Sequence, residues 1–144
     1  MNSNKNKVFQ LELKWHPVAA SVLLALPFVA HSAEFNIKNG VVYTAGNVPV
    51  ININKANDKG LSHNVYDNLN VDKNGLIFNN SMTESNTVLA GKIQGNSNLT
   101  SGTAKVILNE VTSKNASAIN GMMEVAGDKA DLIIANPNGI TVNG

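Results

Sequence analysis

Residues 132–142 read Leu-Ile-Ile-Ala-Asn-Pro-Asn-Gly-Ile-Thr-Val, so that one apolar run enters a tight turn and a second run leaves it. In this turn Asn136 can accept a hydrogen bond from the backbone two residues on. Pro137 presets φ near about −65°, and Gly139 suits the fourth position of a type I turn. Short apolar runs on both sides of such a turn predict short β-strands joined at a tight corner.

Two earlier segments have a related form, in which three large apolar residues are followed by Asn. These segments are Leu76–Asn80 and Val106–Asn109, and with Leu132–Asn136 they start 30 and 26 residues apart (positions 76, 106 and 132). This spacing suggests stacked coils. Strands this short are not stable alone, and stacking would bury their apolar faces and satisfy their backbone groups. An Asn at one corner could then bond to the Asn of the next coil.

We therefore expect an all-β chain that forms a β-helix. The sequence shows no clear amphipathic helical spacing, which disfavours alternating strands and helices. A sandwich of two antiparallel sheets fits the composition nearly as well and stays open as the alternative.

The front of this domain predicts a β-hairpin that caps one end of a sheet. Val41–Tyr43 is followed by a turn at Ala45–Asn47 and by the run Val48–Ile53, whose second half alternates between apolar and polar residues. Pro49 cannot donate a ladder hydrogen bond, so it places its strand at an edge or places itself at the strand's start.

Further turns are expected at Asn57–Gly60 and at Asp72–Gly75, where the dipeptide Asn74-Gly75 tolerates positive φ. The other expectations are a polar stretch over 55–70, a loop over 82–88, a short strand over 89–93, a break over 115–121 and a short strand over 122–125.

Residues 1–32 read as a signal peptide for the general secretion machinery. Lys5, Lys7 and Lys14 precede an apolar stretch of thirteen residues, Val18–Ala30. A helix of that length spans about 20 Å, against about 30 Å for a bilayer core, which disfavours an uncleaved anchor. Cleavage after Ser32 puts the small Ala30 at the third position before the cut, which fits better than cleavage after Ala33.

The composition of residues 33–144 excludes several function classes. The stretch has eight Lys, nine Asp and Glu, no Arg and no Cys, which argues against a nucleic-acid surface and against disulfides. His63 is its one histidine and has no marked nucleophile or orienting partner, and its aspartates do not have a calcium-loop spacing. We expect no enzyme, no cofactor and no metal.

Several motifs in order resemble one family. Gly60–Tyr66 precedes Leu69–Val71, and Asn74–Leu76 follows with Asn79 and Asn80; Val106–Val111 and Ala135–Ile140 come next. In this order they resemble the secretion domain of two-partner-secreted exoproteins, the haemagglutination-activity region of filamentous haemagglutinins, large haemolysins and contact-dependent growth-inhibition toxins. The resemblance covers roughly residues 36–144.

This resemblance implies a right-handed, single-stranded parallel β-helix of the pectin-lyase-like kind, with the hairpin as N-terminal cap. It also implies recognition by a dedicated outer-membrane transporter of a Gram-negative bacterium, with folding outside the cell. The turn and recognition residues that it points to are Asn74, Gly75, Asn96, Asn98, Leu99, Asn136, Pro137, Asn138, Gly139 and Ile140.

Two departures from the family pattern stand out. Ser97 replaces the usual Pro in Asn96–Leu99, and no Cys pair follows the last motif, which weakly favours the adhesin or growth-inhibition branch. We expect residues 33–144 to be the N-terminal part of a secretion domain whose chain continues beyond Gly144. Adhesion, lysis and toxin delivery to a host or bacterial cell surface stay open for that downstream region. The alternative is a stand-alone surface adhesin module.

Overall fold

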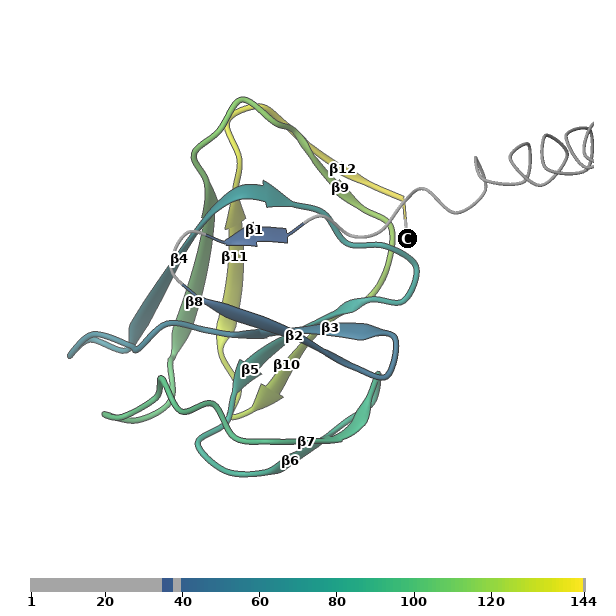
Figure 1. Ribbon diagram of the computed structural model, residues 1–144. Helices are drawn as coiled ribbons and strands as arrows, with labels where there is room; N and C mark the ends of the chain where they lie inside the picture. The colour runs from purple at the N-terminus through teal and green to yellow at the C-terminus, as the bar shows by residue number, and fades with distance from the viewer. Residues whose placement is uncertain (1–34, 38–39, 144) are drawn as a thin grey trace, which may run out of the picture. The chain divides into compact units, whose positions relative to one another are not determined.

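The computed structural model describes residues 35–37 and 40–143 (Figure 1). The predictions for the signal peptide and its cleavage site lie outside these residues. Within them the chain forms β1 (Phe35–Ile37), β2 (Val41–Ala45), β3 (Val48–Asn52), β4 (Leu61–Leu69), β5 (Leu76–Asn80), β6 (Ser85–Thr87), β7 (Gly91–Ile93), β8 (Val106–Val111), β9 (Ser117–Ile119), β10 (Met123–Gly127), β11 (Asp131–Ala135) and β12 (Ile140–Val142). This part of the chain has no helix that is long and apolar enough to cross a membrane.

The strands form a parallel β-helix with three faces. One face has the strand order β1-β4-β8-β11, the second β10-β5-β3-β2, and the third pairs β12 with β9. Along the chain, β5, β8 and β9 make one coil, and β10, β11 and β12 make the next, directly stacked on it with parallel pairing. Figure 1 shows these pairs lying side by side. The parallel pairing excludes the antiparallel sandwich.

The predicted stacking of the three apolar segments is wrong in its register. Leu76–Asn80 lies on a different face from the other two segments, in β5. The other two segments do stack, but Asn109 pairs with Ile134 and not with Asn136. The actual partners are Val106 with Asp131 and Ser117 with Ile140, which lie 25 and 23 positions apart (131 − 106 and 140 − 117). Leu76 pairs with Met123, 47 positions on (123 − 76), because β6 and β7 lie between them. Because each coil contains three similar apolar strands, the sequence pattern alone does not tell which strands share a face.

The predicted contact between asparagines of adjacent coils is present at other positions. Asn79 Nδ2 donates to Asn52 Oδ1 at 3.0 Å, and these two residues are in register between β5 and β3. At another corner, Asn143 Nδ2 donates to Asn120 Oδ1 at 3.0 Å. The carboxamides therefore bridge successive coils as well as closing turns.

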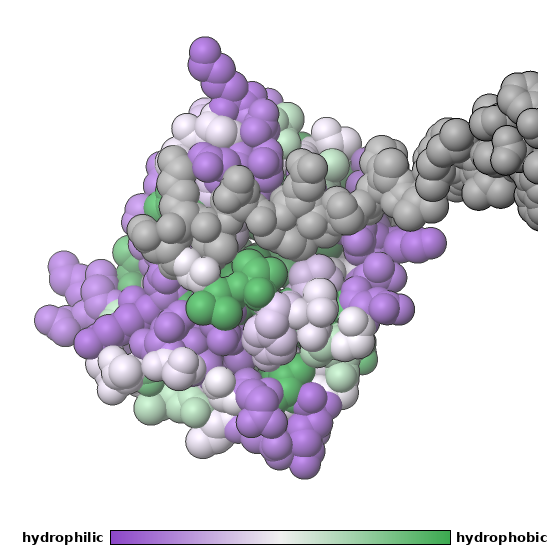
Figure 2. Space-filling view, in the orientation of Figure 1, coloured by the Kyte–Doolittle hydropathy of each residue, from purple (hydrophilic) through white to green (hydrophobic). Residues whose placement is uncertain are grey.

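The capping hairpin is confirmed. β2 pairs antiparallel with β3 around a turn in which Gly46 has a φ of 61°. β1 pairs antiparallel with β4, so antiparallel strands precede the parallel stack on two faces. β2 is one of the two edge strands of its sheet, and Figure 2 shows an apolar patch where Figure 1 places it, consistent with Val41 being 54% exposed.

Pro49 lies near the start of β3, as its missing N–H requires. It faces Thr44 of β2, whereas the pairing of β3 with β5 begins one residue later, at Val50. The sheet is therefore spared a lost hydrogen bond on the side of β5.

The polar stretch over 55–70 contains β4, the longest strand, which the sequence analysis did not predict. Its inward positions include Ser62 and Asn64, both fully buried, so its core-facing side does not read as apolar. The backbone of Asn54 hydrogen-bonds to both side chains. Its N–H donates to Asn64 Oδ1 at 2.9 Å, and its carbonyl accepts from Ser62 Oγ at 2.7 Å. The strand was therefore missed in the sequence because its buried side chains are polar and form hydrogen bonds with nearby residues.

Three short elements also differ from the prediction. β6 lies in the predicted loop over 82–88, and β9 lies in the predicted break over 115–121. β7 begins at Gly91, because residues 88–90 form the turn of the β6–β7 hairpin. The predicted strand over 122–125 is confirmed as β10.

Two apolar clusters stabilise the fold. The larger fills the interior of the coils and includes Tyr66, Phe78 and Ile107, each 0% exposed. The smaller lies around Val50, Ile77 and Ile93, and therefore includes residues of β3, β5 and β7. The second cluster connects the β6–β7 hairpin to the sheet of β3 and β5.

Candidate functional site

The turn at Asn136–Gly139 is closed by a backbone hydrogen bond and by the side chain of Asn136. Gly139 N–H donates to the Asn136 carbonyl at 3.2 Å, and Asn138 N–H donates to Asn136 Oδ1 at 2.9 Å. Asn136 Nδ2 reaches the previous coil, where it donates to the carbonyl of Asn115 at 2.9 Å. Asn138 Nδ2 donates to the carbonyl of Ser113 at 2.7 Å. Both carboxamides thus attach the turn to the coil before it.

The turn at Asn96–Leu99 has the same construction. Asn98 N–H donates to Asn96 Oδ1 at 3.0 Å, and Leu99 N–H donates to the Asn96 carbonyl at 3.2 Å. Asn96 Nδ2 donates to the carbonyls of Ile53 and Asn79, both at 2.9 Å. Ser97, in the place of the usual Pro, is exposed and the turn still forms.

The two turns differ in burial. Asn96 and Leu99 are each 2% exposed, and Leu99 packs in the main core. By contrast, Pro137, Asn138, Gly139 and Ile140 are all exposed. The hydrogen-bond partners of the two turns are different residues, so the structure does not bring the predicted site residues together in one pocket.

The third predicted position, Asn74-Gly75, lies at a separate corner. Asn74 is exposed, and its N–H donates to Asp72 Oδ1 at 2.8 Å. Gly75 is buried with a φ of 87°, and a Cβ there would lie 2.7 Å from the carbonyl oxygen of Met122. Gly75 is therefore required for the close approach of two coils, whereas the side chain of Asn74 points to solvent.

Asn80 is a structural residue that the sequence analysis did not single out as a site. It is fully buried; its Nδ2 donates to the carbonyls of Ala104 and Asp128 at 2.9 Å, and its Oδ1 accepts from Ala104 N–H at 2.7 Å. It thus bridges the segments that precede β8 and β11. Its place after an apolar run is the signal that could have identified it.

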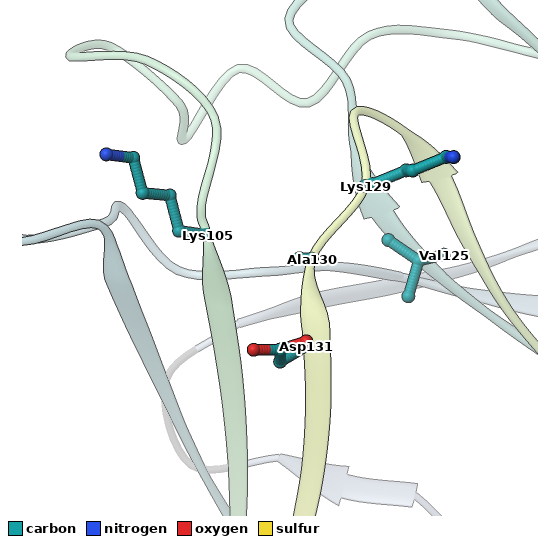
Figure 3. A pocket seen from close by; sticks show the side chains of 5 residues that line it. All are labelled: Lys105, Val125, Lys129, Ala130 and Asp131. Atoms are coloured by element: carbon teal, nitrogen blue, oxygen red, sulfur yellow. The ribbon is translucent and has the colours of Figure 1, made fainter.

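The described residues offer little for catalysis. His63 Nε2 and Glu110 Oε2 lie 2.8 Å apart on β4 and β8, and both side chains are about half exposed. Within the described residues, neither side chain bonds to a serine or threonine hydroxyl that could act as a nucleophile. No group of three His, Asp or Glu side chains in the described ranges is arranged to hold a metal ion. A hollow beside β8 and β11 is lined by Lys105, Val125, Lys129, Ala130 and Asp131, and Figure 3 shows its two lysine amines pointing away from each other.

Comparison with known proteins gives a consistent result. Residues 28–144 match the family described as the TPS secretion domain. The chain is 49% identical over 130 residues to the 16S rRNA endonuclease CdiA of Enterobacter cloacae, covering 86% of this chain and 4% of that protein. It is 44% identical over 122 residues to the filamentous hemagglutinin of Bordetella pertussis, covering 83% of this chain and 3% of that protein.

A solved structure, that of a filamentous hemagglutinin secretion domain, superposes with a TM-score of 0.73 at 45% identity. The match covers 76% of this chain and 37% of that chain. The chain thus spans less than a tenth of the length of the curated relatives named here, and the β-helix fold agrees with that of the solved relative.

Proposed function

The chain belongs to the TPS secretion domain family, and we propose that its two asparagine turns are read by a cognate outer-membrane transporter before the coils fold. The family places this region in large exoproteins that leave Gram-negative bacteria by two-partner secretion. It belongs to the secretion domain of such a protein, and the proposal concerns how its residues perform that task.

The hydrogen bonds of the asparagines carry this proposal. In the folded coils, the carboxamides of Asn96 and Asn136 already bond to main-chain groups of other segments. Asn96 is also 2% exposed. A partner can therefore use the amide groups of Asn96 only while the coils are open, which favours recognition of the unfolded chain.

Strand addition provides a physical means of recognition. An extended segment can pair its backbone with the exposed edge of a sheet in the periplasmic part of the transporter, while pockets select alternate side chains. As chain emerges outside the cell, each new coil packs its aliphatic face on the last, at about 25 cal/mol per Å² of apolar surface buried. Folding on the far side then favours outward movement.

We further propose that residues 1–32 are a cleaved leader for the general secretion machinery and that residues 33–144 form the N-terminal part of the secretion domain. The action of the whole protein on a host or bacterial cell belongs, in this proposal, to residues outside this chain. We attribute no reaction, cofactor or nucleic-acid partner to residues 33–144.

Replacing both Asn136 and Asn138 by Phe tests the proposal. Export into the medium, with the transporter co-expressed, should fall strongly, and binding of the unfolded segment to the periplasmic part of the transporter should fall with it. The control is Asn47→Phe, which changes an exposed asparagine in the β2–β3 turn and should leave both unchanged. Loss of export with undiminished binding of the unfolded segment would show that the turn serves folding and not recognition.

A further inference from the structure

The β6–β7 hairpin is an insertion that depends on the rest of the fold for its position. β6 and β7 form a separate sheet, to which no other described residue adds a strand. Thr87 closes the loop, because its Oγ1 donates to the Gly91 carbonyl at 2.7 Å and accepts from Ala90 N–H at 3.1 Å. An isolated two-stranded hairpin is marginally stable at best in water, so its docking must stabilise it.

The base of the hairpin is tied to chain that precedes it. Asn79 of β5 accepts from Ser81 N–H at 3.2 Å and donates to the Gln94 carbonyl at 2.9 Å. Asn96 N–H donates to the Ser81 carbonyl at 2.7 Å. These contacts need only β5 and the residues around the hairpin itself.

The tip is held instead by the following coil. Glu124 of β10 accepts from Val88 N–H through Oε1 at 2.8 Å and from Leu89 N–H through Oε2 at 3.0 Å. The Leu89 side chain lies close to Gly75, next to the carbonyl of Met122. Thus one carboxylate, 35 and 36 residues further along the chain, fixes two consecutive N–H groups of the turn.

This contact acts on the backbone and not on the side chain of Val88, which is 86% exposed. Hydrogen bonds to an ionised acceptor are shorter and stronger than those between neutral groups. The apolar contacts of the hairpin also involve the later coil, because Ile93 of β7 shares a cluster with Ala126 of β10.

We propose that the hairpin is a strap that closes only after β10 has joined the stack, and that Glu124 is the positioning residue that holds its tip. Closure of the strap therefore reports that β10, the first strand of the next coil, is in place. This inference is independent of whether a transporter reads the asparagine turns.

Hydrogen exchange in the intact secreted protein tests the role of Glu124. The variant Glu124→Gln loses the charge and one acceptor oxygen, and the amides of Val88 and Leu89 should exchange about tenfold faster or more, while those of β5 and β8 stay unchanged. The matched control is Glu84→Gln, since Glu84 Oε1 pairs with Lys92 Nζ at 2.9 Å on the same hairpin, with both side chains about half exposed or more. That control should leave residues 88 and 89 unchanged. Unaltered exchange in Glu124→Gln, or equal acceleration in every strand, would overturn the proposal.

Pulse-labelling during refolding of the unaltered protein tests the order of closure without any variant. Protection of the Val88 and Leu89 amides should follow that of the β5–β10 ladder. Protection of the tip before β10 would refute the strap.

Discussion

At the level of single residues, Gly75 shows how closely the coils approach. Its φ of 87° lies in the left-handed region, and the position of an added Cβ is occupied by backbone. Gly46 has a similar φ of 61°, but an added Cβ would meet nothing within 4 Å. A substitution at Gly46 would therefore introduce backbone strain alone, whereas one at Gly75 would introduce strain and a steric clash.

We predict that Gly75→Ala lowers the free energy of unfolding by at least about 2 kcal/mol, because strain and a backbone clash combine. Gly46→Ala should cost only about 1 kcal/mol, from strain alone. Urea unfolding of the secretion domain measures both. Equal losses would mean that the carbonyl of Met122 moves away without cost.

The buried hydroxyl of Tyr66 makes the free energy of unfolding depend on pH in the alkaline range. Its side chain is 0% exposed and its hydroxyl donates to Asn109 Oδ1 at 2.9 Å. Burial raises the pKa of this hydroxyl above its usual range. The stabilising effect of the neutral hydroxyl is fully present below pH 10, the ordinary pKa, and is lost as the pH rises from there toward the folded-state pKa.

Above pH 10 we therefore expect the free energy of unfolding to fall by about 1.4 kcal/mol per pH unit for this group, because the unfolded state loses the proton first. Tyr66→Phe should be less stable at neutral pH, since Asn109 loses a donor, but its stability should fall less steeply above pH 10. Urea midpoints between pH 8 and 11 measure the slopes. Parallel slopes would contradict the assignment.

At the level of elements, two turns of equal construction lie in different surroundings. Each has an Asn whose side chain closes the turn and reaches another segment. The turn at Asn96 lies against the core, whereas the turn at Asn136 lies near the surface. We therefore expect burial, and not the turn motif itself, to set how much each asparagine contributes to the free energy of unfolding.

We predict that Asn96→Ala lowers the free energy of unfolding by about 2–4 kcal/mol. The buried carbonyl of Asn79 loses the Asn96 donor, and that of Ile53 keeps only the longer bond from Asn98 Nδ2, at 3.2 Å. Asn136→Ala should cost about 1 kcal/mol, since water can replace its bonds. The same urea experiment compares them. A larger loss for Asn136→Ala would show that the surface turn contributes more than its exposure suggests.

For the whole molecule, the last described coil leaves strands with an unpaired side. β11 ends one sheet and β12 pairs only with β9 within the described residues. Ile133 of β11 is 46% exposed and Val142 of β12 is 70% exposed. Exposed apolar strands of this kind favour pairing with other chains.

We predict that residues 33–144, produced alone, self-associate in sedimentation velocity at micromolar concentration. The double variant Ile133→Lys and Val142→Lys should associate less, because charge on an edge opposes strand pairing. A monomeric chain with a cooperative thermal transition would contradict this prediction.

The sequence by itself determined the all-β class, the main turns and the family, but not every strand, because β4, β6 and β9 were missed. The conformation of the Asn-Gly and Asn-Pro-Asn-Gly turns can be predicted from their own residues. The side-chain hydrogen bonds and the positive φ of glycine that form such turns involve no more than four consecutive residues. The hairpin of β2 and β3, the corner at Gly75 and the turn at Asn136 were therefore predictable.

Only the tertiary structure decided which strands share a face and which polar residues are buried. The pairing of Val106 with Asp131, the inward position of Asn64 and the contact of Glu124 with the hairpin tip all join residues more than 20 positions apart or depend on such neighbours. Similar short apolar runs allow several registers, and a buried carboxamide resembles an exposed one in sequence. The choice comes from packing and from satisfying buried backbone groups, which are properties of the assembled coils.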